Sequence, residues 1–386
     1  MLTGVRPTKL AMHQMENGMN EAQAKAFLQE VYCVSEKKAR LAVDIACREK
    51  ALLSKLDYLN GFSLYVGIPF CPSICSYCSF SSSPIDVWSP RMDDYLKALC
   101  IELHHIAKET EGKTLNTIYI GGGTPTTLTA KQLEKLLNVV DELFLNEERG
   151  AELLEYTVEA GRPDSITKEK LEVICSHPVT RISVNPQTMQ QKTLDLVGRK
   201  HTVQAVKDIF HLARELGFDN INMDLIAGLP GENAEDMRDT LRQIEELSPD
   251  SLTVHSLAIK RAARMAQEQP VRDLHTEITE MVEDAAKTAE KLGLVPYYLY
   301  RQKNIAGNFE NVGYAKADKA GIYNILIMEE KQTIYAAGAG ATTKIVLPEK
   351  IKTENGKETN LIRIENVKNI EEYIARIDEM IKRKSN

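Results

Sequence analysis

The sequence lacks the features that would assign it to a membrane, to a secreted disulfide framework or to a nucleic-acid-binding class. No apolar run reaches the ~18 residues that span a bilayer, and the opening stretch MLTGVRPTKLAMHQ has no long apolar segment typical of a signal peptide. The formal net charge is −7, with 48 basic and 55 acidic residues, so no basic excess indicates nucleic acid. We therefore expect a cytoplasmic protein without a membrane span that binds no nucleic acid.

Cysteine is also sparse, with seven residues scattered over a chain of 386. An odd number at irregular spacing suits reduced thiols better than a disulfide framework. Three of the seven nevertheless fall within eight residues, in the stretch LYVGIPFCPSICSYCSFSS, where Cys71, Cys75 and Cys78 have the spacing C-x3-C-x2-C. This concentration of thiols needs an explanation of its own.

Short β-branched segments alternate with longer amphipathic segments through the middle of the chain. Thr129 and Thr202 are the expected N-caps of two of the helices, and Gly217 is expected to end the second. Strands that are joined by helical crossovers form a parallel sheet, which right-handed crossovers can curl into a full or partial barrel. The predicted strands are residues 63–68, 116–122, 155–160, 180–185, 220–226 and 251–257.

Three regions are expected along the chain. Residues 1–60 have a mostly helical pattern and are predicted to form an N-terminal extension packed on the barrel, which takes residues 61–292. Beyond residue 293 the rhythm changes, and GIYNILIM, TIYAAGAGATT and LIRIENV predict additional strands. The final segment, IEEYIARIDEMIKRK, predicts a surface helix with solvated charges. Residues 293–386 are therefore expected to form a small C-terminal α+β region that completes the site.

The three clustered cysteines directly follow the first predicted strand, and active sites of α/β barrels lie at the C-terminal ends of the strands. A structural zinc ion needs four ligands, and no fourth Cys or His follows Cys78 nearby. A thioredoxin-like C-x2-C pair would leave Cys71 unexplained. Three thiolates instead suit a [4Fe-4S] cluster in which one iron is left open for a ligand.

The motifs of this chain, in their order, resemble those of the radical S-adenosylmethionine enzymes, whose signature is C-x3-C-x2-C with an aromatic residue, here Tyr77, before the last cysteine. YVGIPFC…CSYCSF, YIGGGTPTTL, VEAGRPDSI, RISVNPQTM…LVGRKH and NMDLIAGLPGE together resemble the oxygen-independent coproporphyrinogen III oxidase family. LTGVRPTK and YYLYRQKNIAGNFENVGYAK are most similar to its HemZ-type members. The resemblance implies a partial (β/α)6 barrel, a [4Fe-4S] cluster held by Cys71, Cys75 and Cys78, and S-adenosylmethionine as the second cofactor.

The resemblance also implies which residues surround S-adenosylmethionine. Gly122, Gly123 and Thr124 would contact its methionine part, although the glycines alone would fit a tight turn equally well. Glu159 would accept hydrogen bonds from the ribose hydroxyls. Asp224 interrupts an apolar strand, where an unpaired carboxylate is costly to bury, and this favours a role in the site. The other positions implied to line the cofactor are Tyr65, Tyr77, Gln187, Arg199, Ala258 and Thr342.

A coproporphyrinogen carries four propionates, so its pocket should supply cations. The segment AIKRAARM follows the sixth predicted strand, and Arg301 follows the aromatic run YYLY. A solvated basic turn would explain each of these residues equally well. The candidate substrate-binding residues are Lys260, Arg261, Arg264 and Arg301, with Arg6 and Lys9 as further candidates.

Two positions depart from the patterns of the family's branches. Phe80 stands where characterised oxidases have a fourth cysteine. In ENVGYA, Glu310 and Ala315 stand where the haem-chaperone branch has the His and Trp of HNxxYW. The resemblance implies the oxidative decarboxylation of coproporphyrinogen III to protoporphyrinogen IX, with a flavodoxin or ferredoxin as electron donor. A haem-binding or haem-transfer chaperone and a radical haem-degrading enzyme are the alternatives.

Overall fold

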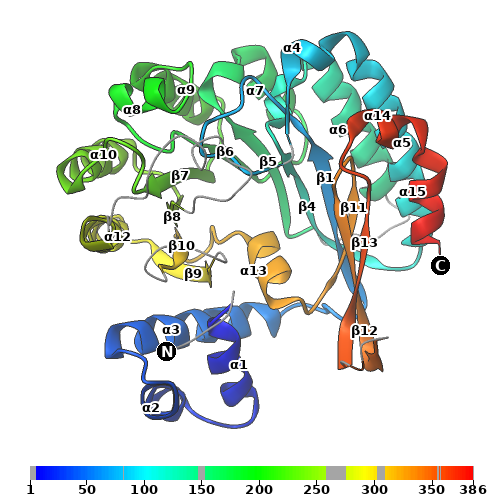
Figure 1. Ribbon diagram of the computed structural model, residues 1–386. Coiled ribbons are helices and arrows are strands. Elements are labelled where there is room, and N and C mark those ends of the chain that lie inside the picture. The colour runs from blue at the N-terminus through cyan, green and yellow to red at the C-terminus, as the bar shows by residue number, and fades with distance from the viewer. Residues whose placement is uncertain are drawn as a thin grey trace.

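A single curved sheet organises the molecule (Figure 1). The computed structural model describes residues 6–80, 82–146, 153–257, 275–301, 309–353, 356 and 358–385. Within these residues the sheet has 11 strands in the order β13-β12-β11-β1-β4-β5-β6-β7-β8-β10-β9. The six strands expected from the sequence are its neighbouring parallel strands, which confirms the predicted α/β fold. They are β1 (Gly61–Ile68), β4 (Thr114–Gly122), β5 (Glu155–Gly161), β6 (Arg181–Val184), β7 (Ile221–Ala227) and β8 (Ser251–Ser256).

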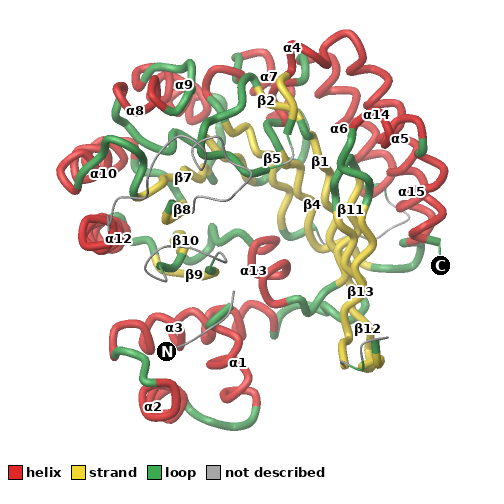
Figure 2. Tube along the Cα trace, in the orientation of Figure 1, coloured by secondary structure: helices red, strands yellow, loops and turns green. Residues whose placement is uncertain are grey.

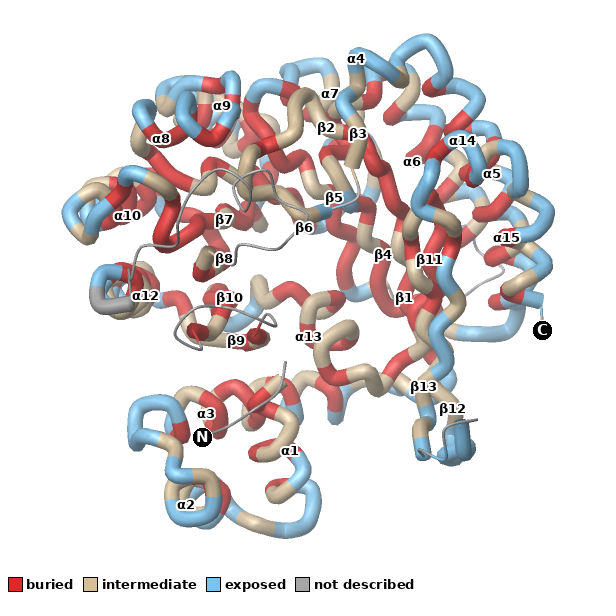
Figure 3. The backbone as a smooth tube through the Cα atoms, viewed as in Figure 1, coloured by how far each residue is buried: buried red, intermediate tan, exposed pale blue. Residues whose placement is uncertain are grey.

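The helices that connect these strands cover the outer face of the sheet (Figure 2). Both expected N-caps are formed: Thr129 Oγ1 accepts a hydrogen bond from the Gln132 amide at 3.2 Å, and Thr202 Oγ1 accepts one from the Ala205 amide at 3.1 Å. The apolar faces of the helices meet the buried strands to form one large core (Figure 3). These helices are α5 (Met92–Glu109), α6 (Ala130–Phe144), α7 (Lys168–Cys175), α8 (Gln191–Leu196), α9 (Val203–Glu215), α10 (Ala234–Leu247) and α12 (His275–Lys291).

The sheet continues beyond the six predicted strands at both edges. At one edge β11 (Thr333–Ala337) pairs in parallel with β1, and β12 (Thr342–Lys352) and β13 (Glu358–Glu365) follow as antiparallel strands. At the other edge β10 (Asn311–Ala315) pairs antiparallel with β8, and β9 (Val295–Tyr300) pairs with β10. Both edges are therefore built from the last part of the chain.

One predicted strand is wrong. The segment GIYNILIM forms the helix α13 (Ile322–Glu329), which contacts β9 and β4 on the inner side of the sheet. Tyr323, Ile325 and Leu326 are all buried in this helix. A helix covered on several sides is apolar nearly all round, so its composition does not distinguish it from a buried strand.

The first part of the chain is helical, as its pattern predicts. It forms α1 (Thr8–Glu16), α2 (Glu21–Tyr32) and α3 (Glu36–Leu53), and α3 lies against β9. The apolar side chains of these helices share a second core cluster with Tyr297, Ile325 and Leu326. The domain boundaries at residues 60 and 292 stay predictions.

The C-terminal segment differs from the single solvated helix that the sequence predicts. It forms two helices, α14 (Ile370–Ala375) and α15 (Ile377–Lys384), which both pack on α5. Lys384 is buried and binds Glu102 of α5, so the expectation of solvated charges is wrong for this residue. No helix in the described ranges has both the length and the apolarity that a membrane crossing needs.

Candidate functional site

The residues predicted from the sequence converge on one cavity, of about 430 Å³, at the C-terminal ends of the parallel strands. Carboxyl ends of neighbouring parallel strands share an edge, which explains why distant motifs meet there. Their roles toward a cofactor stay predictions. The predicted residues that line the cavity are Tyr65, Cys71, Cys75, Tyr77, Cys78, Gly122, Gly123, Thr124, Glu159, Gln187, Arg199 and Asp224.

The other predicted residues lie elsewhere. Thr342 lines a second cavity beside the first. Arg301 is buried, and its Nε donates to Glu310 Oε1 at 3.1 Å, so this guanidinium is engaged within the protein. Arg6 binds Glu330 at 2.7 Å, and Lys9 binds it at 3.3 Å. Ala258, Lys260, Arg261 and Arg264 fall outside the residues that the structure describes.

The cysteine loop follows β1 and is fastened to the segment after α8. The Ser76 amide donates to the Val197 carbonyl at 3.1 Å, and Ser73 Oγ donates to the Gly198 carbonyl at 2.9 Å. Burial, and then the neighbouring sulfurs of Cys75 and Cys71, raise the pKa of the Cys78 thiol. The three thiols therefore lie near enough to influence one another electrostatically.

The arrangement of the thiols fits a cluster better than a single ion. Among the described residues, no group of three or more His, Cys, Asp or Glu side chains is placed to hold one metal ion. A zinc ion would need its ligand atoms within about 2.0–2.3 Å of one point. In an iron–sulfur cluster each thiolate can bind a different iron, so the sulfurs surround a larger group. Cys71, Cys75 and Cys78 line one cavity, and three thiolates there fit a [4Fe-4S] cluster.

Arg162 is a site residue that the sequence analysis did not identify. Its side chain is 5% exposed, and its Nη1 donates to the Ser73 carbonyl at 2.7 Å and reaches Cys75 Sγ at 3.6 Å. Nε and Nη2 bind the two carboxylate oxygens of Asp164 at 3.0 and 2.6 Å. A fixed positive charge thus lies beside the thiols, where it can stabilise an anionic ligand set. The only sequence signal was an RPD triplet shortly after Glu159.

Glu159 lies near the C-terminal end of β5, and neighbouring residues pack closely around its carboxylate. The Tyr119 hydroxyl donates to its Oε1, and the Gly122 amide donates to its Oε2 at 3.3 Å. A Cβ at Gly121 would lie 2.7 Å from the same Oε2, so a larger residue there would displace this carboxylate. Burial raises the pKa of Glu159 to about 7, although the hydrogen bond from Tyr119 opposes the shift.

Asp224, on β7, is the second carboxylate of the cavity. Asn222 Nδ2 donates to it at 2.7 Å, and His255 Nε2 lies 3.9 Å away. Burial alone would raise the pKa of Asp224, but the nearby His255 imidazole and the hydrogen bond from Asn222 hold it below its ordinary value. The cavity therefore contains one carboxylate that is ionised at neutral pH and one that titrates there.

Gln187 has the features of a residue that is held for a ligand. Its φ is 68°, a conformation that non-glycine residues rarely adopt. Two backbone hydrogen bonds join it to β7. The Gln187 amide donates to the Asp224 carbonyl at 2.9 Å, and the Ile226 amide donates to the Gln187 carbonyl at 2.9 Å. Its buried Oε1 has no hydrogen-bond partner among the described residues. An orphaned acceptor in the cavity wall fits a bound polar ligand.

Aromatic side chains form two walls. Tyr65, Tyr119 and Tyr323 stack, with the Tyr119 and Tyr323 ring centroids 4.5 Å apart. On the other side the rings of Tyr298 and Tyr300 are nearly parallel, at 6.3 Å. Flat apolar walls with a few polar groups suit a planar or ring-containing ligand.

Comparisons with known proteins identify the family of this chain. The model of the Radical SAM superfamily matches residues 65–244. The oxygen-independent coproporphyrinogen-III oxidase-like protein HemZ of Bacillus subtilis is 42% identical over 389 residues, which cover 99% of this chain and 76% of that protein. The chain belongs to the radical SAM superfamily and to the HemZ family within it. The predicted resemblance is thereby confirmed, and superfamily membership supports an iron–sulfur cluster and S-adenosylmethionine as cofactors.

Other relatives of this radical SAM chain carry different names. The heme chaperone HemW of Bacillus subtilis is 37% identical over 198 residues, 51% of each chain. The oxygen-independent coproporphyrinogen III oxidase of Escherichia coli is 33% identical over 196 residues, 51% of this chain and 42% of the oxidase. The solved structure of HemN from Escherichia coli has a TM-score of 0.64 at 23% identity, over 86% of this chain and 73% of that one, and shows the shared fold. Membership of the family therefore does not by itself decide between oxidase and chaperone.

The raised pKa of Glu159 gives a pH prediction. Above about pH 7 the Glu159 side chain is a carboxylate that can accept hydrogen bonds from ribose hydroxyls. Below about pH 7 the side chain is protonated. We expect the affinity for S-adenosylmethionine to fall as the pH is lowered from 8 to 6, by up to about tenfold per pH unit below the pKa. Isothermal titration calorimetry measures this. Glu159→Gln, which cannot ionise, should bind weakly at every pH, and a flat profile for the unmodified protein would contradict the assignment.

Proposed function

We propose that this chain is a radical S-adenosylmethionine oxidoreductase that decarboxylates coproporphyrinogen III to protoporphyrinogen IX. The observation that carries the proposal is the single cavity in which the three thiols, the two carboxylates and the aromatic walls meet. The sequence similarity to a coproporphyrinogen-III oxidase-like protein over nearly the whole chain supports the same substrate class.

The cofactor end of the cavity would be organised by the chain's own groups. When bound, the cluster and S-adenosylmethionine supply one-electron chemistry that generates a carbon radical able to remove hydrogen from a C–H bond. Cys71, Cys75 and Cys78 would hold the cluster, and Arg162 fixes the loop that carries Cys75. Glu159 would orient the ribose, and the adjoining tyrosine stack would help to exclude water from the reactive centre.

The substrate end needs a group that holds a propionate near the reactive centre. Arg181, on β6, lines the cavity and is 2% exposed. Its Nη2 donates to Ser251 Oγ at 3.0 Å, while its Nε has no partner in the described part of the chain. Arg181 can therefore hold a carboxylate while a hydrogen atom, one carbon dioxide and one electron leave each reacting propionate. That electron requires an acceptor, and reduction of the cluster requires a separate donor such as flavodoxin or ferredoxin.

A haem-binding chaperone is the second candidate, and one side chain favours it. His255 lines the cavity, and its Nδ1 lies 3.1 Å from the Tyr300 hydroxyl, so an imidazole is available to bind haem iron. The position that holds His in the chaperone branch is different. Glu310 occupies that position and accepts hydrogen bonds from Arg301 and, at 2.9 Å, from Lys38. Because its carboxylate is engaged in these ion pairs, Glu310 is a poor ligand for haem iron. We therefore rank the oxidase first.

Anaerobic product analysis separates the two functions. With S-adenosylmethionine and a strong reductant, the reconstituted protein should release two carbon dioxide molecules from each coproporphyrinogen III and form two vinyl groups. Haem is titrated in parallel. Stoichiometric retention of haem without vinyl product, under conditions where S-adenosylmethionine is cleaved, would show a carrier instead. Cys78→Ala serves as the control that should lack both cofactor cleavage and vinyl product.

A further inference from the structure

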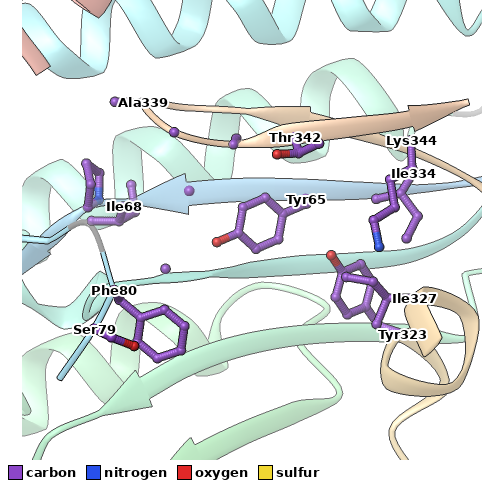
Figure 4. Close-up of a pocket in the computed structure, with 15 residues that line it drawn as sticks. Tyr65, Ile68, Ser79, Phe80, Tyr323, Ile327, Ile334, Ala339, Thr342 and Lys344 are labelled. Carbon is purple, nitrogen blue, oxygen red and sulfur yellow. The ribbon is translucent and has the colours of Figure 1, made fainter. Parts of the chain in front are cut away.

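A second cavity, of about 400 Å³, adjoins the first and runs along β1 (Figure 4). The two cavities share Tyr65, Ser79, Phe80 and Gly122 in their walls. In the sheet, Lys344 of β12 pairs with Ile334 of β11, and Ile334 pairs in turn with Ser63 of β1. From Ser63 to Ile68 the strand rises ~16 Å, at about 3.3 Å per residue, so Lys344 lies well below the mouth of the barrel. The other walls come from α13 and from residues 339–342.

Lys344 is the charged residue among those that line this cavity. Its side chain is 16% exposed and extends from β12 toward Ile327 and Tyr323 (Figure 4). The nearest carboxylate oxygen, Glu330 Oε1, is 3.8 Å away, which is beyond hydrogen-bond distance. Within the described ranges Nζ makes no hydrogen bond. A largely buried ammonium group without an acceptor is costly, and the cavity is the place from which an acceptor can reach it.

The charge around Lys344 is positive. Glu330 is shared by four cations: Arg6 at 2.7 Å, Arg363 at 2.9 Å, Lys9 at 3.3 Å and Lys344 at its longer distance. One carboxylate cannot neutralise four cations. Burial raises the pKa values of the neighbouring Glu49 and Glu329, which opposes the ionised forms of these two carboxyls.

The pKa of Lys344 agrees with this picture. Burial, together with the nearby Arg6, Arg363 and Lys9, lowers it to about 8, although Glu330 opposes the shift. An anion in the cavity would favour the charged form of Lys344 and offset the repulsion among the four cations.

We propose that Lys344 binds a carboxylate arm of the ligand that enters this cavity, and that Arg6, Lys9 and Arg363 provide the positive field behind it. The inference rests on the proposed function, since a porphyrinogen offers propionates. Its ring would lie along the wall formed by Tyr65 and Tyr323, with one propionate reaching down the cavity to Lys344. The cofactor's own carboxylate is a second source of the same chemistry. Arg6 and Lys9, predicted as substrate residues, would then act through Lys344 as positioning residues.

Coproporphyrin III, a stable form of the substrate ring with all its propionates, is the probe. Its fluorescence on titration with the unmodified protein gives the affinity. We expect Lys344→Gln to weaken binding about tenfold or more, because a charge-assisted hydrogen bond is lost. Lys344→Arg should retain most of the affinity, and Arg6→Gln should lose less than Lys344→Gln. The tetramethyl ester, which has no carboxylates, should bind the protein and Lys344→Gln equally.

The controls separate this inference from the proposed function. Lys319→Gln removes a surface cation that pairs with Asp219 at 2.9 Å and should change nothing. If Lys344→Gln binds coproporphyrin normally while the unmodified protein decarboxylates coproporphyrinogen, the inference is overturned and the function stands. If Lys344→Gln loses affinity for S-adenosylmethionine but not for coproporphyrin, the carboxylate belongs to the cofactor and the substrate site is overturned. If the unmodified protein neither binds nor converts the tetrapyrrole, both proposals fail.

Discussion

Replacing Lys384 with Met is expected to lower the free energy of unfolding by roughly 3–5 kcal/mol, because it leaves a buried carboxylate without its cation. The Lys384 and Glu102 side chains are 1% and 0% exposed. Lys384 Nζ also donates to Asn366 Oδ1 at 2.7 Å. Methionine fills a similar volume, so the lost charge rather than a cavity causes the effect. Urea denaturation of the protein without cofactors measures the change.

Two variants test whether the charge is responsible. Lys382→Met changes an exposed residue on the same helix and should alter the unfolding free energy by less than about 0.5 kcal/mol. Glu102→Gln combined with Lys384→Met removes both charges and should recover part of the stability, because no unpaired charge remains buried. A loss below about 1 kcal/mol in Lys384→Met alone would contradict the argument.

The same network holds the wall of the second cavity. Glu102 Oε2 accepts a hydrogen bond from the Gly338 amide at 2.8 Å, and Asn366 Nδ2 donates to the Gly338 carbonyl at 2.8 Å. Gly338 has a φ of 110°, and a Cβ there would lie 2.5 Å from the Gly67 carbonyl oxygen. The turn that follows β11 is thereby pressed against β1. The C-terminal helices therefore fix one wall of a ligand cavity that begins far from them in the sequence.

The sequence predicts the six central strands because each is a short, largely apolar run and a longer helical pattern follows it along the chain. It does not predict how the sheet ends. β10 and β9 pair antiparallel with β8, and β11 pairs with β1 across more than 250 residues of chain. Such long-range pairing has no local pattern. The segment of α13 resembles a strand in sequence because Asn324 is the only polar residue from Ile322 to Met328, and such an apolar run suits either element when it is buried.

The site residues that belong to recognisable motifs are predicted, whereas single residues without a motif are missed. Arg181 and His255 look like ordinary members of β6 and β8 until the curved sheet turns them toward the cavity. Arg301 and Glu310 are nine positions apart, and only the β9–β10 pairing shows that they neutralise each other. The basic segment with Lys260, Arg261 and Arg264 lies outside the described residues, so its substrate role stays a prediction.

Replacement of the three clustered cysteines is expected to have the largest effect on the iron and sulfide content of the protein. We expect Cys71→Ala, Cys75→Ala and Cys78→Ala combined to abolish iron and sulfide binding after anaerobic reconstitution, because the variant lacks every thiolate that faces the cavity. The four other cysteines should be dispensable. Cys33 and Cys175 are exposed, at the ends of α2 and α7.

The matched control replaces Cys33, Cys47, Cys100 and Cys175 with Ser and keeps the motif. This variant should bind the full complement of iron and sulfide and show the visible absorption of a [4Fe-4S] cluster. Denaturation of both variants without cofactors checks that each is folded, since Cys75 is buried and its loss could loosen the loop. Full iron loading of the triple alanine variant would contradict the assignment. Loss of iron in the serine control alone would place the cluster on the other cysteines, none of which is among the described residues that line the cavity with Glu159 and Asp224.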